Sequence, residues 1–203
     1  MNSPRKGDFL MFTGIITNLG KLKKKNGSVF IFEADRKFCR KLGSGASVAV
    51  NGTCLTIFEK PTLTSFSVEL MPETLNRTMF KHIKLNEPVN LELPLSPAAF
   101  LSGHLVQGHI DGVAQLKKFT KKGNSLILQF SLPENIGKYV AEKGSIAVNG
   151  ISLTVALATK SYFTVGIIPY TWTNTMLKTI KIGNFVNIET DILAKYLEKL
   201  MKK

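Results

Sequence analysis

The string Val148-Asn149-Gly150-Ile151-Ser152-Leu153-Thr154-Val155 occurs twice in this chain, the first time as Val50-Asn51-Gly52-Thr53-Cys54-Leu55-Thr56-Ile57. The two glycines are 98 positions apart (150 − 52), which is nearly half of the 203 residues. Self-similarity at a fixed spacing is the mark of a duplicated architecture. The rest of the chain should therefore match itself at the same spacing.

It does so along most of its length, always at 97 or 98 positions. The matching segments are Ser28-Val29-Phe30 with Ser125-Leu126-Ile127, Ser47-Val48-Ala49 with Ser145-Ile146-Ala147, Phe66-Ser67-Val68 with Phe163-Thr164-Val165, Met71-Pro72-Glu73-Thr74 with Ile168-Pro169-Tyr170-Thr171, and Val89-Asn90-Leu91-Glu92 with Val186-Asn187-Ile188-Glu189. The chain is therefore predicted to hold two copies of one domain, each of about 95 residues, which is enough for an independent core.

Composition places the chain among ordinary globular proteins, with 44% hydrophobic residues. No run approaches the ~20 apolar residues of a membrane span, and the N-terminus lacks the apolar segment of a signal peptide, so we expect a cytoplasmic protein. Residues 1–10 have no counterpart in the second half and are predicted to be a disordered extension. Cys39 and Cys54 have no cysteine at their repeat positions, which argues against a structural disulfide.

The formal net charge of +13 raises the question of a nucleic-acid partner. No aromatic residue alternates with the lysines as it does in single-strand binders, and no nucleic-acid motif is present. The lysines gather at equivalent turns of the two halves, namely Lys21, Lys23, Lys24, Lys25, Lys117, Lys118, Lys121 and Lys122. We interpret them as solvated basic turns, which are also compatible with attracting a small anion.

Hydrophobic patterning and turn signals predict about six short strands and two small helices in each half. In the first half the strands are expected at 12–22, 28–34, 47–50, 54–59, 65–71 and 89–93, with helices at 36–42 and 72–81. In the second half the strands are expected at 108–119, at 125–132 and at 185–190, with further strands that end at 155 and at 166. Helices are expected at 133–142 and beginning at 169. The connections are too short for parallel crossovers, which favours small antiparallel barrels.

A final helix at 192–203 has no counterpart in the first half. One apolar stripe runs along it, formed by Leu193, Tyr196, Leu197, Leu200 and Met201, and Asp191 is a plausible N-cap. The stripe should bury either against the chain's own barrel or against another copy of the chain, and the sequence favours neither.

No common catalytic arrangement or metal-ligand spacing is present. Small polar residues instead recur at equivalent expected strand ends. They are Ser47, Asn51, Cys54, Thr56 and Thr74 in the first half, and Ser145, Asn149, Ser152, Thr154 and Thr171 in the second. A threonine in a strand is usually a good β-former and Asn-Gly often completes a turn, but five polar positions kept through a duplication point to shared chemistry.

Four motifs carry a resemblance to a known family. They are Met11-Phe12-Thr13-Gly14-Ile15-Ile16, Val50-Asn51-Gly52-Thr53-Cys54-Leu55-Thr56, Gly103-His104-Leu105-Val106-Gln107-Gly108-His109-Ile110-Asp111-Gly112 and Val148-Asn149-Gly150-Ile151-Ser152-Leu153-Thr154. In this order they resemble the riboflavin synthase family, alpha-chain type, whose members are lumazine-binding double barrels. The resemblance implies a mainly β fold with two tandem homologous six-stranded antiparallel β-barrels of closed Greek-key type and a C-terminal α-helix.

The same resemblance sets the expected domains. They are an N-terminal extension at 1–10, a first lumazine-binding barrel at 11–96, a linker and start of the second barrel at 97–107, a second lumazine-binding barrel at 108–190, and a trimerisation helix at 191–203.

The activity implied by the resemblance is a dismutation that ends riboflavin biosynthesis. Two molecules of 6,7-dimethyl-8-ribityllumazine meet in one active site, and a four-carbon unit passes between them. The products are riboflavin and 5-amino-6-(D-ribitylamino)uracil. The resemblance implies a transferase without metal or cofactor, acting as a homotrimer, with a lumazine synthase capsid as a candidate partner and no nucleic-acid or membrane partner. The alternative is a non-catalytic lumazine or flavin carrier of the same fold.

Substrate-binding residues carry over from the resemblance position by position. The first pocket is expected to contain Gly14, Ile15, Ile16, Cys54, Leu55, Thr56, Glu69, Leu70, Met71, Pro72, Glu73 and Thr74. The second is expected to contain Gly108, His109, Ile110, Ser152, Leu153, Thr154, Gly166, Ile167, Ile168, Pro169, Tyr170 and Thr171, with Lys143 contributed across an interface. Backbone groups at the strand ends would bind the pyrimidine edge, and threonine hydroxyls would bind the ribityl chain.

Four residues are implied in the chemistry: His109, Cys54, Ser47 and Asp191. His109 is our candidate for moving or positioning the substrate's acidic methyl proton, since histidine is the side-chain type that changes charge near neutral pH. Its other interpretation is a histidine that only closes a strand end. Cys54 is a nucleophile or a pocket wall, and Asp191 is a catalytic group or a helix cap.

Overall fold

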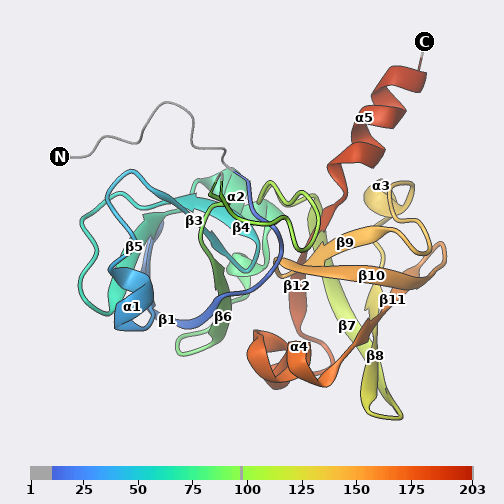
Figure 1. Ribbon diagram of the computed structural model, residues 1–203, viewed down its shortest axis with the longest axis horizontal. Helices are drawn as coiled ribbons and strands as arrows, with labels where there is room; N and C mark the ends of the chain where they lie inside the picture. Colours follow the sequence, from blue (N-terminus) through green and yellow to red (C-terminus); the bar gives the residue numbers. More distant parts are fainter. Residues whose placement is uncertain (1–10, 97, 203) are drawn as a thin grey trace.

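Two β-barrels lie side by side, and a single helix projects away from them (Figure 1). The computed structural model describes residues 11–96 and 98–202, so the predicted extension at 1–10 lies outside the described residues. The elements of the first barrel are β1 (Asn18–Asn26), β2 (Val29–Glu33), α1 (Arg36–Cys39), β3 (Ser47–Val50), β4 (Thr53–Thr56), β5 (Ser65–Glu69), α2 (Pro72–Arg77), the 3-10 helix η1 (Met79–Lys81) and β6 (Pro88–Glu92).

The second barrel repeats this order. Its elements are β7 (Gly112–Lys122), β8 (Ser125–Ser131), α3 (Glu134–Gly137), β9 (Ser145–Val148), β10 (Ile151–Ala158), β11 (Tyr162–Ile167), α4 (Pro169–Asn174), the 3-10 helix η2 (Met176–Thr179) and β12 (Phe185–Thr190), followed by α5 (Ile192–Met201). Every strand pair is antiparallel. The predicted fold class is therefore confirmed.

The two barrels differ in how completely they close. The second is a closed barrel in the order β10-β11-β8-β7-β12-β9. The first is a six-stranded sheet in the equivalent order β4-β3-β6-β1-β2-β5, and its two edges meet only through an isolated bridge between Ile57 and Val68. β10 is eight residues long and reaches β11, whereas β4 has only four residues and stops short of β5. The longer strand is what completes the second barrel.

The first strand of each half begins later than predicted. β1 starts at Asn18 rather than residue 12, and β7 starts at Gly112 rather than residue 108. The residues before each strand leave their own barrel at Gly14 and Gly108, whose φ angles of +75° and +81° suit glycine. We call the residues before β1 and before β7 the crossing segments. Alternating hydrophobicity does not reveal that they leave their own barrel, because they are also partly buried.

The helix predicted at 72–81 is also divided. Thr78 has an extended backbone (φ −119°, ψ 163°), so α2 ends before it and η1 begins after it. The helices predicted at 36–42 and 133–142 are single turns of four residues each. By contrast, β3 and β12 have the predicted bounds.

Each barrel has its own apolar core. The first is rich in aromatic rings, with Phe30, Phe32, Phe66 and Phe80 in mutual contact at centroid separations of 5.7–6.4 Å. The second is mainly aliphatic and contains one such buried pair, Phe130 and Phe163, at 5.6 Å. Burying an aromatic ring removes some 150–250 Å² from water. The two domains predicted by the repeat therefore each bury a separate core.

Four buried asparagines join the two barrels through a pseudo-twofold set of hydrogen bonds. Within each barrel, Asn51 Oδ1 accepts from the Asn90 amide at 2.8 Å, and Asn149 Oδ1 accepts from the Asn187 amide at 2.7 Å. Between the barrels, Asn90 Nδ2 donates to the Asn149 carbonyl at 2.9 Å, and Asn187 Nδ2 donates to the Asn51 carbonyl at 2.8 Å. The Nδ2 groups of Asn90 and Asn187 therefore each donate to the opposite half.

The same side chains also hold the 3-10 helices. Asn90 Oδ1 accepts from the Met176 amide at 2.8 Å, and Asn187 Oδ1 accepts from the Met79 amide at 2.7 Å. Buried amide groups stabilise a structure only when they are hydrogen-bonded. Here the side-chain amides of Asn90 and Asn187 find their partners only when both barrels are in place. This network sets how the barrels face one another.

The axis of the pseudo-symmetry passes between the two repeated glycines. A Cβ atom on Gly52 would lie 2.5 Å from the Gly150 nitrogen, and both glycines have φ of +75°. The motif that occurs twice in the sequence is therefore the point where the two copies touch.

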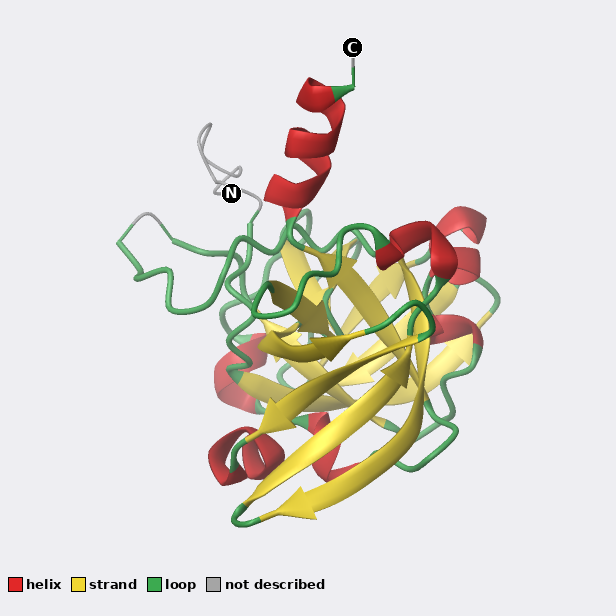
Figure 2. Cartoon of the chain, turned by 90° about the vertical axis from the view of Figure 1, so that its right-hand side faces the viewer, coloured by secondary structure: helices red, strands yellow, loops and turns green. Residues whose placement is uncertain are grey.

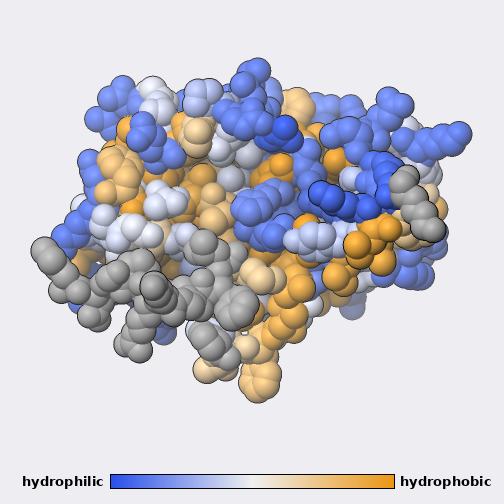
Figure 3. Space-filling view, turned by 90° about the horizontal axis from the view of Figure 1, so that it is seen from above, coloured by the Kyte–Doolittle hydropathy of each residue, from blue (hydrophilic) through white to orange (hydrophobic). Residues whose placement is uncertain are grey.

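The C-terminal helix α5 projects from the second barrel (Figures 1 and 2) and contacts it through polar side chains, Glu198 with Lys138 and Tyr139, and Lys195 with Asp111. Asp191 caps it as predicted, accepting from the Leu193 amide at 3.0 Å. Leu197, Leu200 and Met201 are 59%, 80% and 79% exposed. Of the two expectations for this stripe, packing against the chain's own barrel is therefore wrong. Apolar side chains gather on the face of the molecule from which α5 projects (Figure 3).

Candidate active site

The segments before β1 and β7 exchange places between the barrels. Cys54 in β4 donates its backbone N–H to the Gly108 carbonyl at 3.0 Å, and Ser152 in β10 donates to the Gly14 carbonyl at 2.8 Å. A Cβ on Gly108 would lie 2.5 Å from Cys54 Cβ, so only glycine permits this approach. Each barrel therefore presents its strand β4 or β10 to the crossing segment of the other.

This exchange corrects one part of the expected grouping. Gly14 was expected in the pocket of Cys54, and Gly108 in the pocket of Ser152. The structure places them the other way round, because each segment crosses the barrel interface before its own strand begins. The two repeats alone do not distinguish the arrangements, since Gly14 and Gly108 are equivalent in sequence.

A cavity of about 490 Å³ lies where the second crossing segment meets the first barrel. It brings together two of the four proposed catalytic residues, Cys54 and His109, with Thr74 of α2. The lining residues are Thr53, Cys54, Glu73, Thr74, Arg77, Thr78, Gln107, Gly108, His109, Ile110, Asp111, Ile192 and Lys195. A volume of this size accommodates one ligand of drug or nucleoside dimensions.

Cys54 is held as a neutral thiol in this cavity. Burial raises the pKa of the Cys54 thiol, and the negative charge of Glu189 raises it further, while a hydrogen bond from the Ser47 side chain lowers it. The Cys54 and Ser47 side chains, both proposed from the sequence, thus meet across the β3–β4 pair. A thiol with a raised pKa is a poor nucleophile at neutral pH, so the environment favours the pocket-wall interpretation of Cys54.

Two buried carboxylates anchor the crossing segments. Glu189, at the end of β12, accepts the Gln107 amide at 2.6 Å and the Gly108 amide at 2.9 Å. Glu92, at the end of β6, accepts the Thr13 and Gly14 amides at 2.7 and 3.1 Å, and also the Thr13 hydroxyl at 2.7 Å. Both glutamates are less than 5% exposed. Neither was predicted as a site residue.

The Gln107–Gly108 segment is also tied to the C-terminal helix. Asp111 accepts from the Thr190 amide and hydroxyl, both at 2.8 Å, and forms an ion pair with Lys195 of α5 at 2.5 Å. Within residues 11–96 the first barrel has no helix equivalent to α5, so among the described residues this contact occurs beside the Cys54 cavity and not beside Ser152. It makes the two sites similar but not identical.

The second site is centred on Ser152. His104 Nδ1 lies 2.7 Å from Ser152 Oγ, and His104 Nε2 is the one buried side-chain nitrogen or oxygen without a hydrogen-bond partner in the described part of the chain. Burial lowers the pKa of His104, and the nearby Asp191 carboxylate partly offsets this. Asp191, the fourth proposed catalytic residue, is thus close to this site while it also caps α5.

Most of the remaining proposed residues line open surfaces at the ends of the strands. Met71, Ile168 and Tyr170 are 69%, 57% and 73% exposed. Thr56, Thr154 and Lys143 are also exposed, and Thr74 and Thr171 are half-buried. Apolar side chains so exposed beside a polar cleft indicate a surface that another molecule covers.

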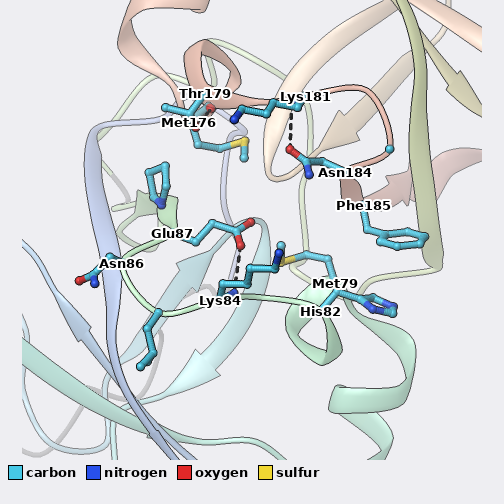
Figure 4. A pocket seen from close by; sticks show the side chains of 13 residues that line it. Met79, His82, Lys84, Asn86, Glu87, Met176, Thr179, Lys181, Asn184 and Phe185 are labelled. Atoms are coloured by element: carbon cyan, nitrogen blue, oxygen red, sulfur yellow. Dashed lines mark hydrogen bonds between the residues drawn. The ribbon is translucent and has the colours of Figure 1, made fainter.

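A separate cavity of about 570 Å³ lies between the barrels, at the starts of β6 and β12 (Figure 4). Lys84 and Lys181 lie on its rim, and the rings of His82 and Phe185 stack at 4.3 Å. None of the residues proposed for substrate binding lines it. The volume of a cavity therefore does not identify the candidate active site. The polar groups at Cys54 and Ser152 identify it.

Two further observations concern the described residues only. No group of three or more histidine, cysteine, aspartate or glutamate side chains in them is arranged to hold a metal ion. No helix in them is long and apolar enough to cross a membrane.

Comparison with known proteins agrees with this geometry. The lumazine binding domain matches the chain twice, at residues 13–94 and 107–191. Riboflavin synthase of Photobacterium phosphoreum is 39% identical over 94% of this chain and 89% of its own length. The chain belongs to the riboflavin synthase family. Among other members, the riboflavin synthases of Actinobacillus pleuropneumoniae and Bacillus subtilis are 39% and 34% identical, each over 95% of this chain and 91% of their own length.

Solved structures share the fold of this family member. A protein named LumP, complexed with 6,7-dimethyl-8-(1'-D-ribityl) lumazine, superposes with a TM-score of 0.78 at 23% identity, covering 89% of this chain and 99% of that one. LumP complexed with riboflavin gives 0.78 at 24% identity with the same coverage. At this identity the likeness shows the double-barrel fold alone.

The family motifs and the repeat did not single out Glu92, Glu189, Asp111 or Lys195. A signal existed for the glutamates, because Val89-Asn90-Leu91-Glu92 matches Val186-Asn187-Ile188-Glu189 and places a charge at the end of an otherwise buried strand. Buried charges are rare unless they are paired or hydrogen-bonded. Asp111 and Lys195 had no such signal, since their pairing depends on where α5 begins.

Proposed function

We propose that this chain is a riboflavin synthase that converts two molecules of 6,7-dimethyl-8-ribityllumazine into riboflavin and 5-amino-6-(D-ribitylamino)uracil. The observation that carries the proposal is the identity of 34–39% to riboflavin synthases along nearly the whole chain. The duplicated site supports it, because a reaction between two copies of one molecule needs two similar binding places.

The chemistry asks the protein mainly to orient two reactants. Holding them in a reactive geometry contributes as much as ~7 to 11 kcal/mol to lowering a barrier. Neutral hydrogen-bonding groups suffice for that purpose, and both sites contain backbone amides and small polar side chains, among them Cys54 at the first and Ser152 at the second. Charged side chains also line the Cys54 cavity, namely Glu73, Arg77, Asp111 and Lys195. In this proposal the strand ends at Cys54 and Ser152 bind one pyrimidine edge each, and Thr56, Thr74, Thr154 and Thr171 meet the ribityl hydroxyls.

Proton transfer is assigned to the crossing segment that lines the Cys54 cavity. The substrate's acidic methyl group must lose a proton before it attacks the second ring. His109 is the group we propose for moving or positioning that proton, with Cys54 and Ser47 forming the adjacent wall. The raised pKa of Cys54 supports this division of roles, because it keeps the sulfur protonated.

We also propose a homotrimer assembled through α5. The exposed stripe of Leu193, Tyr196, Leu197 and Leu200 supports self-association. In such an assembly the open Cys54 site of one chain would face the Ser152 site of its neighbour, with Lys143 reaching across. A cytoplasmic location and an enclosing lumazine synthase capsid stay predictions.

The second candidate function is a lumazine or flavin carrier. The fold of LumP, whose structures contain lumazine or riboflavin, favours it. The higher identity to the synthases and the polar groups kept in both sites favour the enzyme.

Mixing the purified protein with 6,7-dimethyl-8-ribityllumazine decides between them. We expect the absorbance of riboflavin to appear, with one pyrimidinedione formed per riboflavin. A carrier would only shift the spectrum of the ligand, and ligand recovered unchanged after prolonged incubation would exclude the enzyme.

Substitution tests the threonine assignments. We expect Thr154→Val to weaken lumazine binding by roughly three- to tenfold, the effect of about 1 kcal/mol for one lost hydrogen bond. Thr120→Val, at an exposed position on β7, is the control. An equal effect of the two changes on the dissociation constant would remove Thr154 from the site.

A further inference from the structure

Glu189 is a buried carboxylate whose charge acts on Cys54, yet the proposed mechanism does not use it. Its carboxylate is 2% exposed and receives two consecutive backbone amides, those of Gln107 and Gly108. Hydrogen bonds to an ionised acceptor are about twice as strong as neutral ones. The next residue in the chain is His109.

Val106 pairs with Phe12 just before this segment and Asp111 bonds to β12 just after it, and between these two anchors the Gln107–Gly108 turn is held from two sides. The Gly108 carbonyl accepts from the Cys54 amide, and the Gly108 and Gln107 amides donate to Glu189. Gly108 itself has φ of +81° and no side chain to pack. A free glycine segment would sample many conformations. These bonds directly hold the residue before His109, and they therefore contribute to placing His109 relative to Cys54.

We propose that Glu189 is the positioning residue of the Cys54 site: its carboxylate anchors the Gln107–Gly108 turn and thereby holds His109 over the cavity. This inference rests on the proposed function, because it assigns the anchor to the site where that reaction would take place. Glu92 performs the equivalent task for Gly14 beside Ser152.

The two anchors differ in strength. The Thr13 hydroxyl gives Glu92 a third hydrogen bond, and no side-chain bond of Gln107 to Glu189 occurs in the described residues. The charged and titratable groups around Glu189 are Asp111 before β7, Lys195 of α5 and Cys54 of β4. Burial raises the pKa of Glu189 to about 7, despite the two amide bonds and Lys195, and with Asp111 adding to the rise. Protonation removes acceptor strength, so the anchor should weaken as pH falls below about 7.

Glu189→Gln is the direct test, with Glu59→Gln on the exposed turn after β4 as the matched control. Gln keeps the volume, but its NH₂ group cannot accept from a backbone amide. We expect kcat for riboflavin formation at pH 8 to fall roughly ten- to a hundredfold, the range for a lost charge-assisted bond. We also expect the rise of wild-type activity through pH 7 to be smaller in the variant, and the control to match wild type in both.

A second readout reports position directly. The chain has three histidines, so ring-proton NMR signals can be assigned one by one. We expect the His109 signal to shift and broaden in Glu189→Gln while His82, stacked on Phe185, is unchanged. If Glu189→Gln does not fold, Glu189→Asp replaces it. That variant keeps the charge but withdraws it by one methylene, and we expect a smaller loss of kcat and a retained pH dependence.

The outcomes separate this inference from the proposed function. Wild-type protein that binds lumazine without forming riboflavin contradicts the function, and the His109 spectra still decide the role of Glu189. A Glu189→Gln variant with wild-type kcat, wild-type pH profile and an unmoved His109 signal overturns the inference.

Discussion

At the scale of single residues, glycines and buried carboxylates decide how closely the two barrels approach. Gly52 and Gly150 touch at the pseudo-twofold axis, and Gly108 lies against Cys54. Positive φ explains why glycine is favoured at each place, and the absence of a Cβ explains why it is required. The effect of positive φ can be separated from that of the close approach by comparison with a glycine that has positive φ but no neighbouring atom near its Cβ position.

We expect Gly52→Ala to lower the free energy of unfolding by about 2 to 4 kcal/mol, because a Cβ would overlap the backbone at Gly150 as well as strain φ. Gly27→Ala is the control, since Gly27 has φ of +59° and no atom within 4 Å of its added Cβ. That change should cost only about 1 kcal/mol. Denaturant unfolding of the two variants makes the comparison, and equal losses would mean that the close approach carries no cost.

The raised pKa of Glu189 also predicts how stability depends on pH. A carboxyl whose folded pKa of about 7 exceeds its ordinary value of 4.5 binds its proton more tightly when folded. Its stabilising contribution is therefore complete below pH 4.5 and is lost as pH rises to about 7. We expect the free energy of unfolding of wild type, minus that of Glu189→Gln, to fall by about 3 kcal/mol across this window. A difference that stays flat or rises would contradict a buried, destabilised carboxylate.

Substitution of Cys54 tests whether its thiol is a nucleophile or only part of the pocket wall. Because Ser152 occupies the equivalent position and burial keeps Cys54 protonated, we expect Cys54→Ser to retain riboflavin formation within about tenfold of wild type. Ser152→Cys, the reciprocal exchange, is the companion variant. Complete loss of activity in a folded Cys54→Ser protein would restore the nucleophile interpretation.

At the scale of elements, the crossing segments and α5 provide the features of the site that the sequence repeat does not predict. The segments before β1 and β7 link each barrel to the site of the other, and α5 leaves its apolar side uncovered. The Lys195–Asp111 ion pair connects these two features, since it ties α5 to the segment that carries His109. In the proposed trimer, assembly through α5 and the arrangement of the site would therefore be connected.

We expect Leu200→Glu to dissociate the assembly to monomers, because this 80% exposed side chain would be buried against other copies. Lys199→Glu, an adjacent exposed position on the same helix, introduces the same charge off the stripe. Sedimentation velocity at matched concentrations measures both. A monomeric wild type, or a Leu200→Glu variant that keeps the wild-type mass, would exclude α5 as the assembly contact.

At the scale of the whole molecule, the asparagine network makes two separate cores into one body. Asn90 and Asn187 each bond to the opposite barrel through both the amide nitrogen and the amide oxygen of the side chain. Removing one such side chain leaves backbone groups of the other barrel buried without partners, which costs more than the bonds themselves contribute.

We expect Asn187→Leu to lower the free energy of unfolding by about 3 kcal/mol, through the Met79 amide and the Asn51 carbonyl that it leaves unpaired. Asn90→Leu should cost a similar amount by pseudo-symmetry, and Asn135→Leu on exposed α3 should change little. In scanning calorimetry we expect one transition for wild type and two for the double variant. A double variant that still unfolds in one transition would show that other contacts couple the barrels.

From the sequence by itself came the duplication, the antiparallel double barrel, the bounds of strands such as β3 and β12, the Asp191 cap and the family. The duplication follows from matching two stretches 98 positions apart, and the other features follow from local periodicity or from short motifs. Tertiary structure alone decided which crossing segment meets which strand, where Glu189 and Lys195 lie, and that the α5 stripe faces away from its own barrel. Gly14 and Gly108 are equivalent in the repeat, so no local pattern distinguishes a segment that stays from one that crosses. The choice depends on contacts between residues 54 positions (108 − 54) and 138 positions (152 − 14) apart, which form only when both barrels are folded and docked.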